Sequence, residues 1–384
     1  MSTPPLVDLS PLLPLAAVAA CAALPALAWW WWRARRAGPG ARLAALTALT
    51  LFLTLDLIAF GAFTRLTDSG LGCPDWPGCY GEAHPLAAHD EIRSAQSAMP
   101  SGPVTVAKAW IEMVHRYLAM AVGLLILIAA VLAWRGRRQL PHSPWWATLT
   151  LLWVLVQGAF GKYTVTLKLY PAVVTAHLLG ALVLLALLVL QHESFRARPL
   201  PPGTLARRWV AVAIGVLVVQ VALGGWVSTN YAVLACSGFP TCNGQWWPAM
   251  DAGHGFTLLR ELGRAGHGGF LPFEALVAIH WAHRAFALVA VAVLTALAVA
   301  LARSGQPGAR RYAQALALLL LAQLASGLSN VVLGWPIAGA LLHSVGAALL
   351  VALLASLWAR LAPASVPAVR PAPIPSLRPA RPIA

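Results

Sequence analysis

Four histidines have the residue type and the spacing that a chemical site would need. They stand in four short motifs: E-M-V-H-R (112–116), T-A-H-L-L-G-A (175–181), H-W-A-H-R (280–284) and L-L-H-S-V-G-A (341–347). Each histidine lies about five to seven residues into an apolar run, which is roughly 8–10 Å at 1.5 Å per helical residue. Ionisable residues inside a membrane cost free energy and usually mark a function. We therefore expect His115, His177, His283 and His343 to share one depth and one role.

Pairs of opposed neutral imidazoles suit the two axial positions of a haem iron. In each half of the chain one histidine belongs to the second helix and the other to the fourth helix of a predicted four-helix unit, whose facing surfaces can bring them together. This predicts one haem site at His115 and His177 and another at His283 and His343. The alternatives are an interfacial, hydrogen-bonded role for a single histidine, and mononuclear zinc, which prefers ligands closer together in sequence.

An arginine directly follows the first histidine of each pair. Arg116 and Arg284 are candidates to pair with haem propionates, because guanidinium groups bind carboxylates strongly. The alternative is that both side chains extend to lipid headgroups.

The two halves differ at the position three residues before the first histidine of each pair. Glu112 lies three residues before His115, whereas His280 occupies that position before His283. A carboxylate beside a porphyrin can act as a base, a proton relay or a stabiliser of positive charge, so the first half is the predicted catalytic half. The alternatives are a structural ion pair of Glu112 with Arg116, four residues on, and a packing role for His280.

Composition places most of the chain in lipid. Of 384 residues, 59% are hydrophobic and 10% are charged, far from the roughly one-quarter charged residues of a soluble domain. We predict an all-α, polytopic membrane protein. Nine apolar runs are long enough to cross a bilayer, which needs roughly 20 residues: 11–32, 43–63, 109–134, 145–163, 171–191, 209–228, 276–301, 312–332 and 338–359.

The positions of the basic residues indicate how the chain is oriented in the membrane. The net charge of +15 is spread over short clusters between the apolar runs, which argues against a nucleic-acid partner and fits the positive-inside rule. Most of the 27 Lys and Arg residues fall inside if the N-terminus is outside and the C-terminus is cytoplasmic, in the inner (plasma) membrane of a bacterial-type cell. The two long outer segments, 64–108 and 229–275, are expected to be ordered loops.

An internal repeat organises the chain. The histidines recur at offsets of 168 and 166 residues, and the outer-loop cysteines recur at 163. The repeat predicts two pseudo-symmetric four-helix bundles related by an axis along the membrane normal. The predicted parts are 1–42, an extra N-terminal helix with a basic loop; 43–198, the first half; 199–360, the second half; and 361–384, a cytoplasmic tail without a packed fold.

Four of the five cysteines form two short-spaced pairs, C-P-D-W-P-G-C (73–79) and C-S-G-F-P-T-C (236–242). Because both segments are assigned to the oxidising side of the membrane, we predict the disulfides Cys73–Cys79 and Cys236–Cys242. Metal binding or thiol redox exchange is the alternative.

The chain resembles the heme A synthase family over about residues 43–360. The resemblance rests on F-T-R-L-T-D-S-G-L-G-C-P-D-W-P (63–77) and on the four histidine motifs, each at its place in the repeat. It implies oxidation of the C8 methyl group of heme O to the formyl group of heme A, for cytochrome oxidase assembly. It also implies a substrate haem at His115 and His177, an essential acidic Glu112, and a haem b at His283 and His343 that passes electrons.

Partners and competing functions follow from the same features. Heme O is the implied substrate, and a heme O synthase and an electron donor are candidate partners, the former for the extra helix. A dihaem b-type electron-transfer protein and a haem transporter are the alternatives. The first normally stacks its haems at two depths, and the second predicts broken mid-span helices with a polar site near the bilayer centre.

Overall fold

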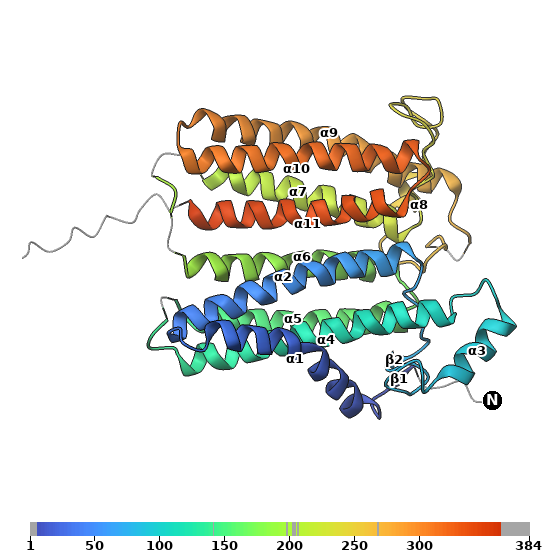
Figure 1. Ribbon diagram of the computed structural model, residues 1–384. Helices are drawn as coiled ribbons and strands as arrows, with labels where there is room; N and C mark the ends of the chain where they lie inside the picture. The colour runs from blue at the N-terminus through green and yellow to red at the C-terminus, as the bar shows by residue number, and fades with distance from the viewer. Residues whose placement is uncertain are drawn as a thin grey trace, which may run out of the picture.

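The computed structural model describes residues 6–140, 142–196, 199–201, 205, 207–266 and 269–361. Its long helices run roughly parallel to one another, and the short elements gather at one end (Figure 1). We call this the disulfide end, because both cysteine loops follow helices that finish there. The predicted tail, apart from Leu361, lies outside the described residues.

The described part of the chain is all-α apart from two paired two-residue strands, β1 (Val7–Asp8) and β2 (Trp76–Pro77). The helices are α1 (Leu12–Ala34), α2 (Pro39–Leu66), α3 (His89–Ala98), α4 (Val106–Arg135), α5 (Trp145–Thr166), α6 (Pro171–Ser194), α7 (Arg207–Thr229), α8 (Ala252–Gly255), α9 (Phe273–Arg303), α10 (Pro307–Val332) and α11 (Ile337–Arg360).

Within the described residues, eight helices are long and apolar enough to cross a membrane: α1, α2, α4, α6, α7, α9, α10 and α11. The chain is therefore a multi-pass membrane protein. The ninth predicted span coincides with α5, a helix of 22 residues that packs between α4 and α6. Gln157 and Lys162 lower the mean hydropathy of α5, and its crossing of the membrane stays a prediction.

Local sequence fixes several helix ends. Proline occupies the first turn of α2, α6 and α10, where a missing backbone N–H costs nothing. Thr105 caps α4 by accepting a hydrogen bond from the Lys108 backbone N–H at 3.2 Å. Pro25 lies inside α1, which bends visibly along its length in Figure 1, as expected where proline removes an internal hydrogen bond.

The long helices pack in two sets of neighbours. In the first half, α2 contacts α4 and α6, and α5 contacts the same two helices; in the second half, α7 contacts α9 and α11, and α10 contacts the same two. Between the halves, α6 contacts α11 and α7, and α2 contacts α11. At the end opposite the disulfide end, Glu193 of α6 accepts from Arg360 Nε and Ser356 Oγ of α11, both at 2.8 Å. Helix α1 packs on α4 and α2.

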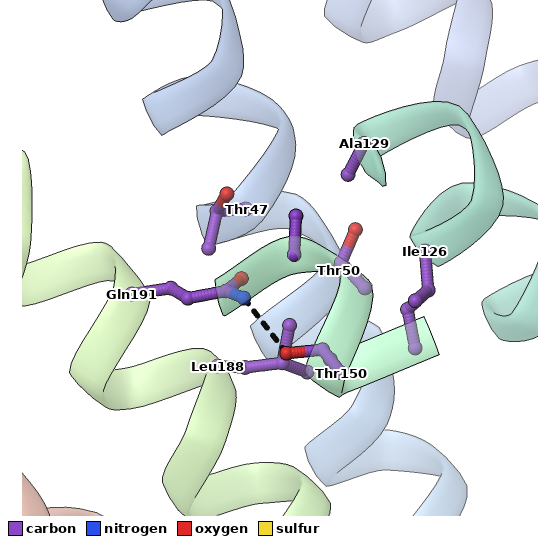
Figure 2. Close-up of a pocket in the computed structure, with 8 residues that line it drawn as sticks. Thr47, Thr50, Ile126, Ala129, Thr150, Leu188 and Gln191 are labelled. Atoms are coloured by element: carbon purple, nitrogen blue, oxygen red, sulfur yellow. Dashed lines mark hydrogen bonds between the residues drawn. The ribbon is translucent and has the colours of Figure 1, made fainter. Parts of the chain in front are cut away.

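The interiors of the two halves differ in polarity. Thr47, Thr50, Thr150 and Gln191 line a cavity of about 10 Å³ in the first half, and Gln191 Nε2 donates to Thr150 Oγ1 at 2.7 Å (Figure 2). This volume is about that of one water molecule. The residues at the same repeat positions in the second half are all apolar and belong to its core: Val210, Ala213, Leu316 and Leu357.

The disulfide end carries more structure than the sequence analysis predicted. The first outer loop contains α3, a helix of ten residues, and the second contains the single turn α8. The expectation of loops alone was wrong for α3. Its only buried side chain is Ile92, and ten residues with one strongly apolar side chain are too few to predict a helix from apolar spacing.

Candidate functional site

Each of the four histidines faces a glycine on a neighbouring helix of its own half. In the first half, a Cβ atom added to Gly61 of α2 would lie 3.0 Å from His115 Nε2, and one added to Gly161 of α5 would lie 3.7 Å from His177 Cε1. Any larger residue at Gly61 would push the imidazole away. Gly61 therefore gives the His115 ring its space, whereas a Cβ atom at Gly161 would make an ordinary contact with His177.

The second half repeats this arrangement. A Cβ atom at Gly224 of α7 would lie 3.0 Å from His283 Cε1, and one at Gly327 of α10 would lie 3.1 Å from His343 Cε1. Gly61 and Gly224 are 163 residues apart, and Gly161 and Gly327 are 166 apart. These are the repeat offsets of the cysteines and of the second histidine in each pair.

The structure brings the predicted pair of the second half together. The ring centres of His283 and His343 are 6.5 Å apart, and the ring planes are inclined by 83°. Both rings have hydrogen-bond partners at Nδ1: Gln220 Nε2 lies 3.2 Å from that atom of His283, and Ser326 Oγ lies 3.1 Å from that of His343.

The rings of the first half have more apolar surroundings. His115 stacks with Phe60 at a centre-to-centre distance of 6.4 Å and an angle of 8°. His177 Nδ1 is buried and has no hydrogen-bond partner among the described residues. The two histidines of this half thus lack the polar contacts that hold their counterparts.

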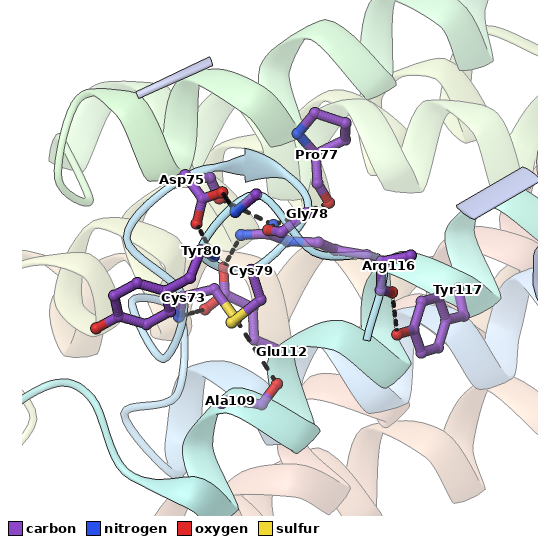
Figure 3. The surroundings of a disulfide bond; sticks show 12 residues. Cys73, Asp75, Pro77, Gly78, Cys79, Tyr80, Ala109, Glu112, Arg116 and Tyr117 are labelled. Carbon is purple, nitrogen blue, oxygen red and sulfur yellow. Dashed lines mark hydrogen bonds and ion pairs between the residues drawn. A yellow bond between two sulfur atoms is a disulfide. The ribbon is translucent and has the colours of Figure 1, made fainter. Parts of the chain in front are cut away.

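Glu112 is a buried junction between α4 and the first cysteine loop (Figure 3). Its Oε2 accepts the Cys73 backbone N–H at 2.8 Å, and its Oε1 forms an ion pair with Arg116. The ion pair considered from the sequence is therefore present. Glu112 is 4% exposed and lies one helical turn from His115.

His280 makes the matching contacts in the second half. Its Nδ1 accepts the Cys236 backbone N–H at 3.4 Å, and Arg284 Nε lies 3.1 Å from its Nε2. The two halves therefore share one architecture at this position and differ in whether a carboxylate or an imidazole occupies it.

The two arginines hold the cysteine loops over the helices. Arg116 donates to the carbonyl oxygens of Asp75 and Pro77 at 3.0 Å, and also to that of Gly78. Arg284 donates to the carbonyl oxygens of Cys236 and Gly238 at 2.9 Å and of Thr241 at 3.2 Å. In this structure the guanidinium groups point into the loops.

Both predicted disulfides are confirmed. Cys73 bonds to Cys79, and Cys236 bonds to Cys242. All four cysteines are buried. Cys73 and Cys79 belong to a hydrophobic cluster that includes residues of α4. Cys236 and Cys242 belong to one that includes residues of α7 and α9. Within the described residues, no three His, Cys, Asp or Glu side chains form a metal-binding group.

Gly61, Gly224, Gln220 and Ser326 contact the histidines and were not predicted from the sequence. The glycines were detectable, because their offset of 163 residues equals that of the cysteines. No sequence signal marks Gln220 and Ser326, because their repeat counterparts, Leu57 and Phe160, are apolar.

Comparison with known proteins identifies the family of this chain. The sequence model of the COX15-CtaA family, described as cytochrome oxidase assembly protein, matches residues 44–355. The chain is similar to the heme A synthase of Shewanella oneidensis, with 40% identity over 79% of this chain and 92% of that protein. It is also similar to the heme A synthases of Sphingopyxis alaskensis, with 32% identity over 82% and 90%, and of Halalkalibacterium halodurans, with 25% identity over 79% and 93%. The predicted family is confirmed: the chain belongs to the COX15-CtaA family, the heme A synthases of cytochrome oxidase assembly.

Proposed function

We propose that this membrane oxidoreductase converts the C8 methyl group of heme O into the formyl group of heme A, with the substrate haem in the first half and a resident haem b in the second. One observation supports this assignment of the two haems. Glu112 and His280 make matching contacts with their cysteine loops, but only the first half has a carboxylate at this position. The carboxylate marks the first half as the half that performs chemistry.

The residues of the second half fit a haem iron. Two imidazoles on opposite sides of one metal, each nitrogen about 2.0 Å from it, have ring centres about 6 Å apart. The rings of His283 and His343 are 6.5 Å apart. Gly224 and Gly327 leave the space beside each ring free of side chains. These features support His283 and His343 as the residues that would hold the haem iron, and the repeat extends the proposal to His115 and His177.

The protein's own groups would position the substrate and handle protons. When bound, haem supplies the redox-active iron for reaction with oxygen. Oxygenation of a methyl group also consumes electrons and protons, and Glu112 is the acidic group next to His115. Because the Cys73 N–H and Arg116 hold the carboxylate in place, it can exchange a proton or stabilise positive charge at a fixed position.

Arg116 and Arg284 have a second proposed role beside loop attachment. Binding of haem propionates by these arginines, as expected from the sequence, stays a prediction. Their present partners are neutral carbonyl oxygens, together with Glu112 in an ion pair with Arg116 and the His280 ring beside Arg284. An incoming carboxylate could exchange with a carbonyl oxygen without leaving a buried charge unpaired.

Helix contacts support two bundles related by a twofold axis. Contacts α2–α11 and α6–α7 exchange when the halves are exchanged, and α6–α11 maps onto itself, as an isologous interface requires. We assign 43–198 and 199–360 to the two bundles. Helix α1 lies outside the family match; we propose it as an added span and a candidate contact for the heme O synthase.

The orientation follows from charge and from the disulfides. We propose that the disulfide end faces the outside of the inner membrane and that α11 ends in the cytoplasm. Arginine clusters adjoin the opposite ends of α1, α4 and α9, in agreement with the positive-inside rule.

The first experiment is haem analysis in a host that makes heme O but no heme A. Membranes with and without the full chain are extracted with acid acetone, and the haems are separated by chromatography. We expect heme A or its hydroxylated precursor only when the chain is present. A chain that co-purifies with haem b but leaves heme O unmodified, with electron donor and oxygen supplied, would favour the dihaem electron-transfer alternative.

The transporter alternative has less support. It predicted broken mid-span helices, whereas each of the four helices that carry the histidine pairs, α4, α6, α9 and α11, is one continuous helix.

A further inference from the structure

The two histidine pairs differ in the hydrogen bonding of the ring nitrogen that would face away from a bound metal. A ligating histidine usually donates its other ring N–H to an acceptor, which fixes the tautomer, orients the ring and raises the basicity of the ligand. In the second half both rings have such a partner, Gln220 for His283 and Ser326 for His343.

The direction of the bond at Ser326 can be deduced. Its hydroxyl donates to the Ala322 carbonyl oxygen at 2.7 Å, so the hydrogen of the hydroxyl is already used. The oxygen, 3.1 Å from His343 Nδ1, is therefore left as an acceptor. This bond places the ring proton on Nδ1 of His343 and leaves its Nε2 lone pair available to a metal.

Gln220 can do the same for His283. Its Oε1 is buried without a hydrogen-bond partner among the described residues, while its Nε2 lies 3.2 Å from His283 Nδ1. A half-turn of the carboxamide gives that oxygen the Nδ1–H as its partner, in exchange for a 3.3 Å bond from Nε2 to the His283 carbonyl oxygen. The amide thus offers the acceptor that a ligating His283 needs.

The first half has no equivalent of either partner. Leu57 occupies the repeat position of Gln220, and Phe160 that of Ser326. His177 Nδ1 is buried without a partner among the described residues, and no hydrogen bond within them reaches the His115 ring, which stacks on Phe60 instead. Polar contacts therefore orient neither ring of the first half.

We propose that Gln220 and Ser326 are positioning residues that fix the second-half haem as a resident cofactor, and that Leu57 and Phe160 leave the first-half imidazoles free to turn away from the iron. This inference rests on the proposed function. A substrate haem must enter and leave in every catalytic cycle, so the residues that would hold it must also be able to release it. A resident electron carrier needs no such release, so the hydrogen bonds occur only in the half that keeps its haem.

The test uses the full-length protein purified with its haem. Gln220→Leu and Ser326→Ala each remove one acceptor. Loss of such a partner typically weakens metal binding 10–100-fold, so we expect haem transfer from the second half to an excess of apomyoglobin to accelerate by about 10–100-fold. The midpoint potential of the low-spin haem should rise, because a less basic imidazole stabilises ferric iron less.

Matched variants separate positioning from packing. Ser326→Thr retains the hydroxyl and should restore the potential and the release rate. Ser344→Ala removes a serine next to His343 whose hydroxyl donates to the Ala340 carbonyl oxygen and has no other partner among the described residues. Gln191→Leu removes a buried glutamine of the first half. Neither control should change the spectrum or potential of the resident haem.

Haem release rates and midpoint potentials of Gln220→Leu and Ser326→Ala equal to those of the parent would overturn the proposal. These measurements do not require heme A formation, so the inference can fail while the synthase activity stands. A chain that makes no heme A yet shows both shifts would reject the proposed reaction and leave the positioning role intact. A chain purified without low-spin haem would reject both.

Discussion

Arg65 of α2 lies over the ring of Tyr231, with the guanidinium carbon 3.9 Å from the ring centre, and so joins the two halves at the disulfide end. The Tyr231 hydroxyl also donates to Asp68, which stands 163 residues earlier in the chain. Asp68 and Tyr231 are thus repeat counterparts that touch each other. In the arrangement proposed above, in which a twofold axis relates the halves, such counterparts can touch only near that axis.

Removing the Tyr231 ring should loosen this junction. A cation–π contact is worth about 0.5–2 kcal/mol, so we expect Tyr231→Leu to lower the free energy of unfolding by about 1 kcal/mol. Thermal unfolding in detergent measures the change. Tyr231→Phe keeps the ring and should retain most of the stability, and equal loss in both variants would assign the effect to the hydroxyl instead.

The same tyrosine should titrate at unusually high pH. Burial raises the pKa of Tyr231, while Arg65 acts in the opposite direction. Because the folded-state pKa is above the unfolded value of about 10, the stabilising contribution is complete below pH of about 10 and is lost as pH rises through the folded pKa. Ultraviolet difference titration of the parent against Tyr231→Phe should show this phenol ionising above a free tyrosine; a normal midpoint would contradict it.

A side chain at Gly224 should displace the His283 ring. Gly224→Ala brings a Cβ atom to 3.0 Å from His283 Cε1, so we expect the ring to shift and the low-spin haem content of the purified protein to fall several-fold. Gly215→Ala, on the same helix with no atom within 4 Å, is the control. Alanine normally stabilises a helix relative to glycine by roughly 0.5–1 kcal/mol. Equal haem content in the two variants would show that haem binding does not need the space beside His283 at Gly224.

Glu112 should be required for oxidation but not for the resident haem. We expect Glu112→Gln to reduce heme A formation by about 10²–10⁴-fold, the usual contribution of a general acid or base, with the low-spin spectrum of the second half unchanged. Glutamine can still accept the Cys73 N–H, so the loop should stay in place. Glu91→Gln, which removes an exposed negative charge on α3, is the control. Normal heme A yield from Glu112→Gln would remove this carboxylate from the chemistry.

The two disulfides should have separate effects. Cys73 donates its backbone N–H to Glu112, so replacing Cys73 and Cys79 by serine should reduce heme A formation and spare the resident haem. Cys236 contacts His280 and Arg284, so the matching double variant should reduce retention of the resident haem. Each loss should destabilise the protein by about 2 kcal/mol. If both double variants changed the same readout equally, the loops would act only through global stability.

The sequence by itself determined the features that depend on local pattern. Runs of apolar residues fix helices because every backbone polar group in lipid must be satisfied within the helix. The repeat made the histidine pairs visible, and the spacing of the cysteines kept each disulfide within one short loop. The short helix α3 was not predicted, because ten mostly polar residues with one buried side chain give too weak an apolar signal.

Only the tertiary structure decided which residues meet across helices. A hydropathy pattern leaves the rotation and crossing angle of each helix open, and these two quantities determine that Gly224 faces His283 and that Ser326 reaches His343. The direction of Arg116 toward the loop carbonyls was equally open, because its long side chain can reach lipid, propionate or backbone. Contact between Arg65 and Tyr231 depends on how two repeats pack, which no pattern within one repeat can specify.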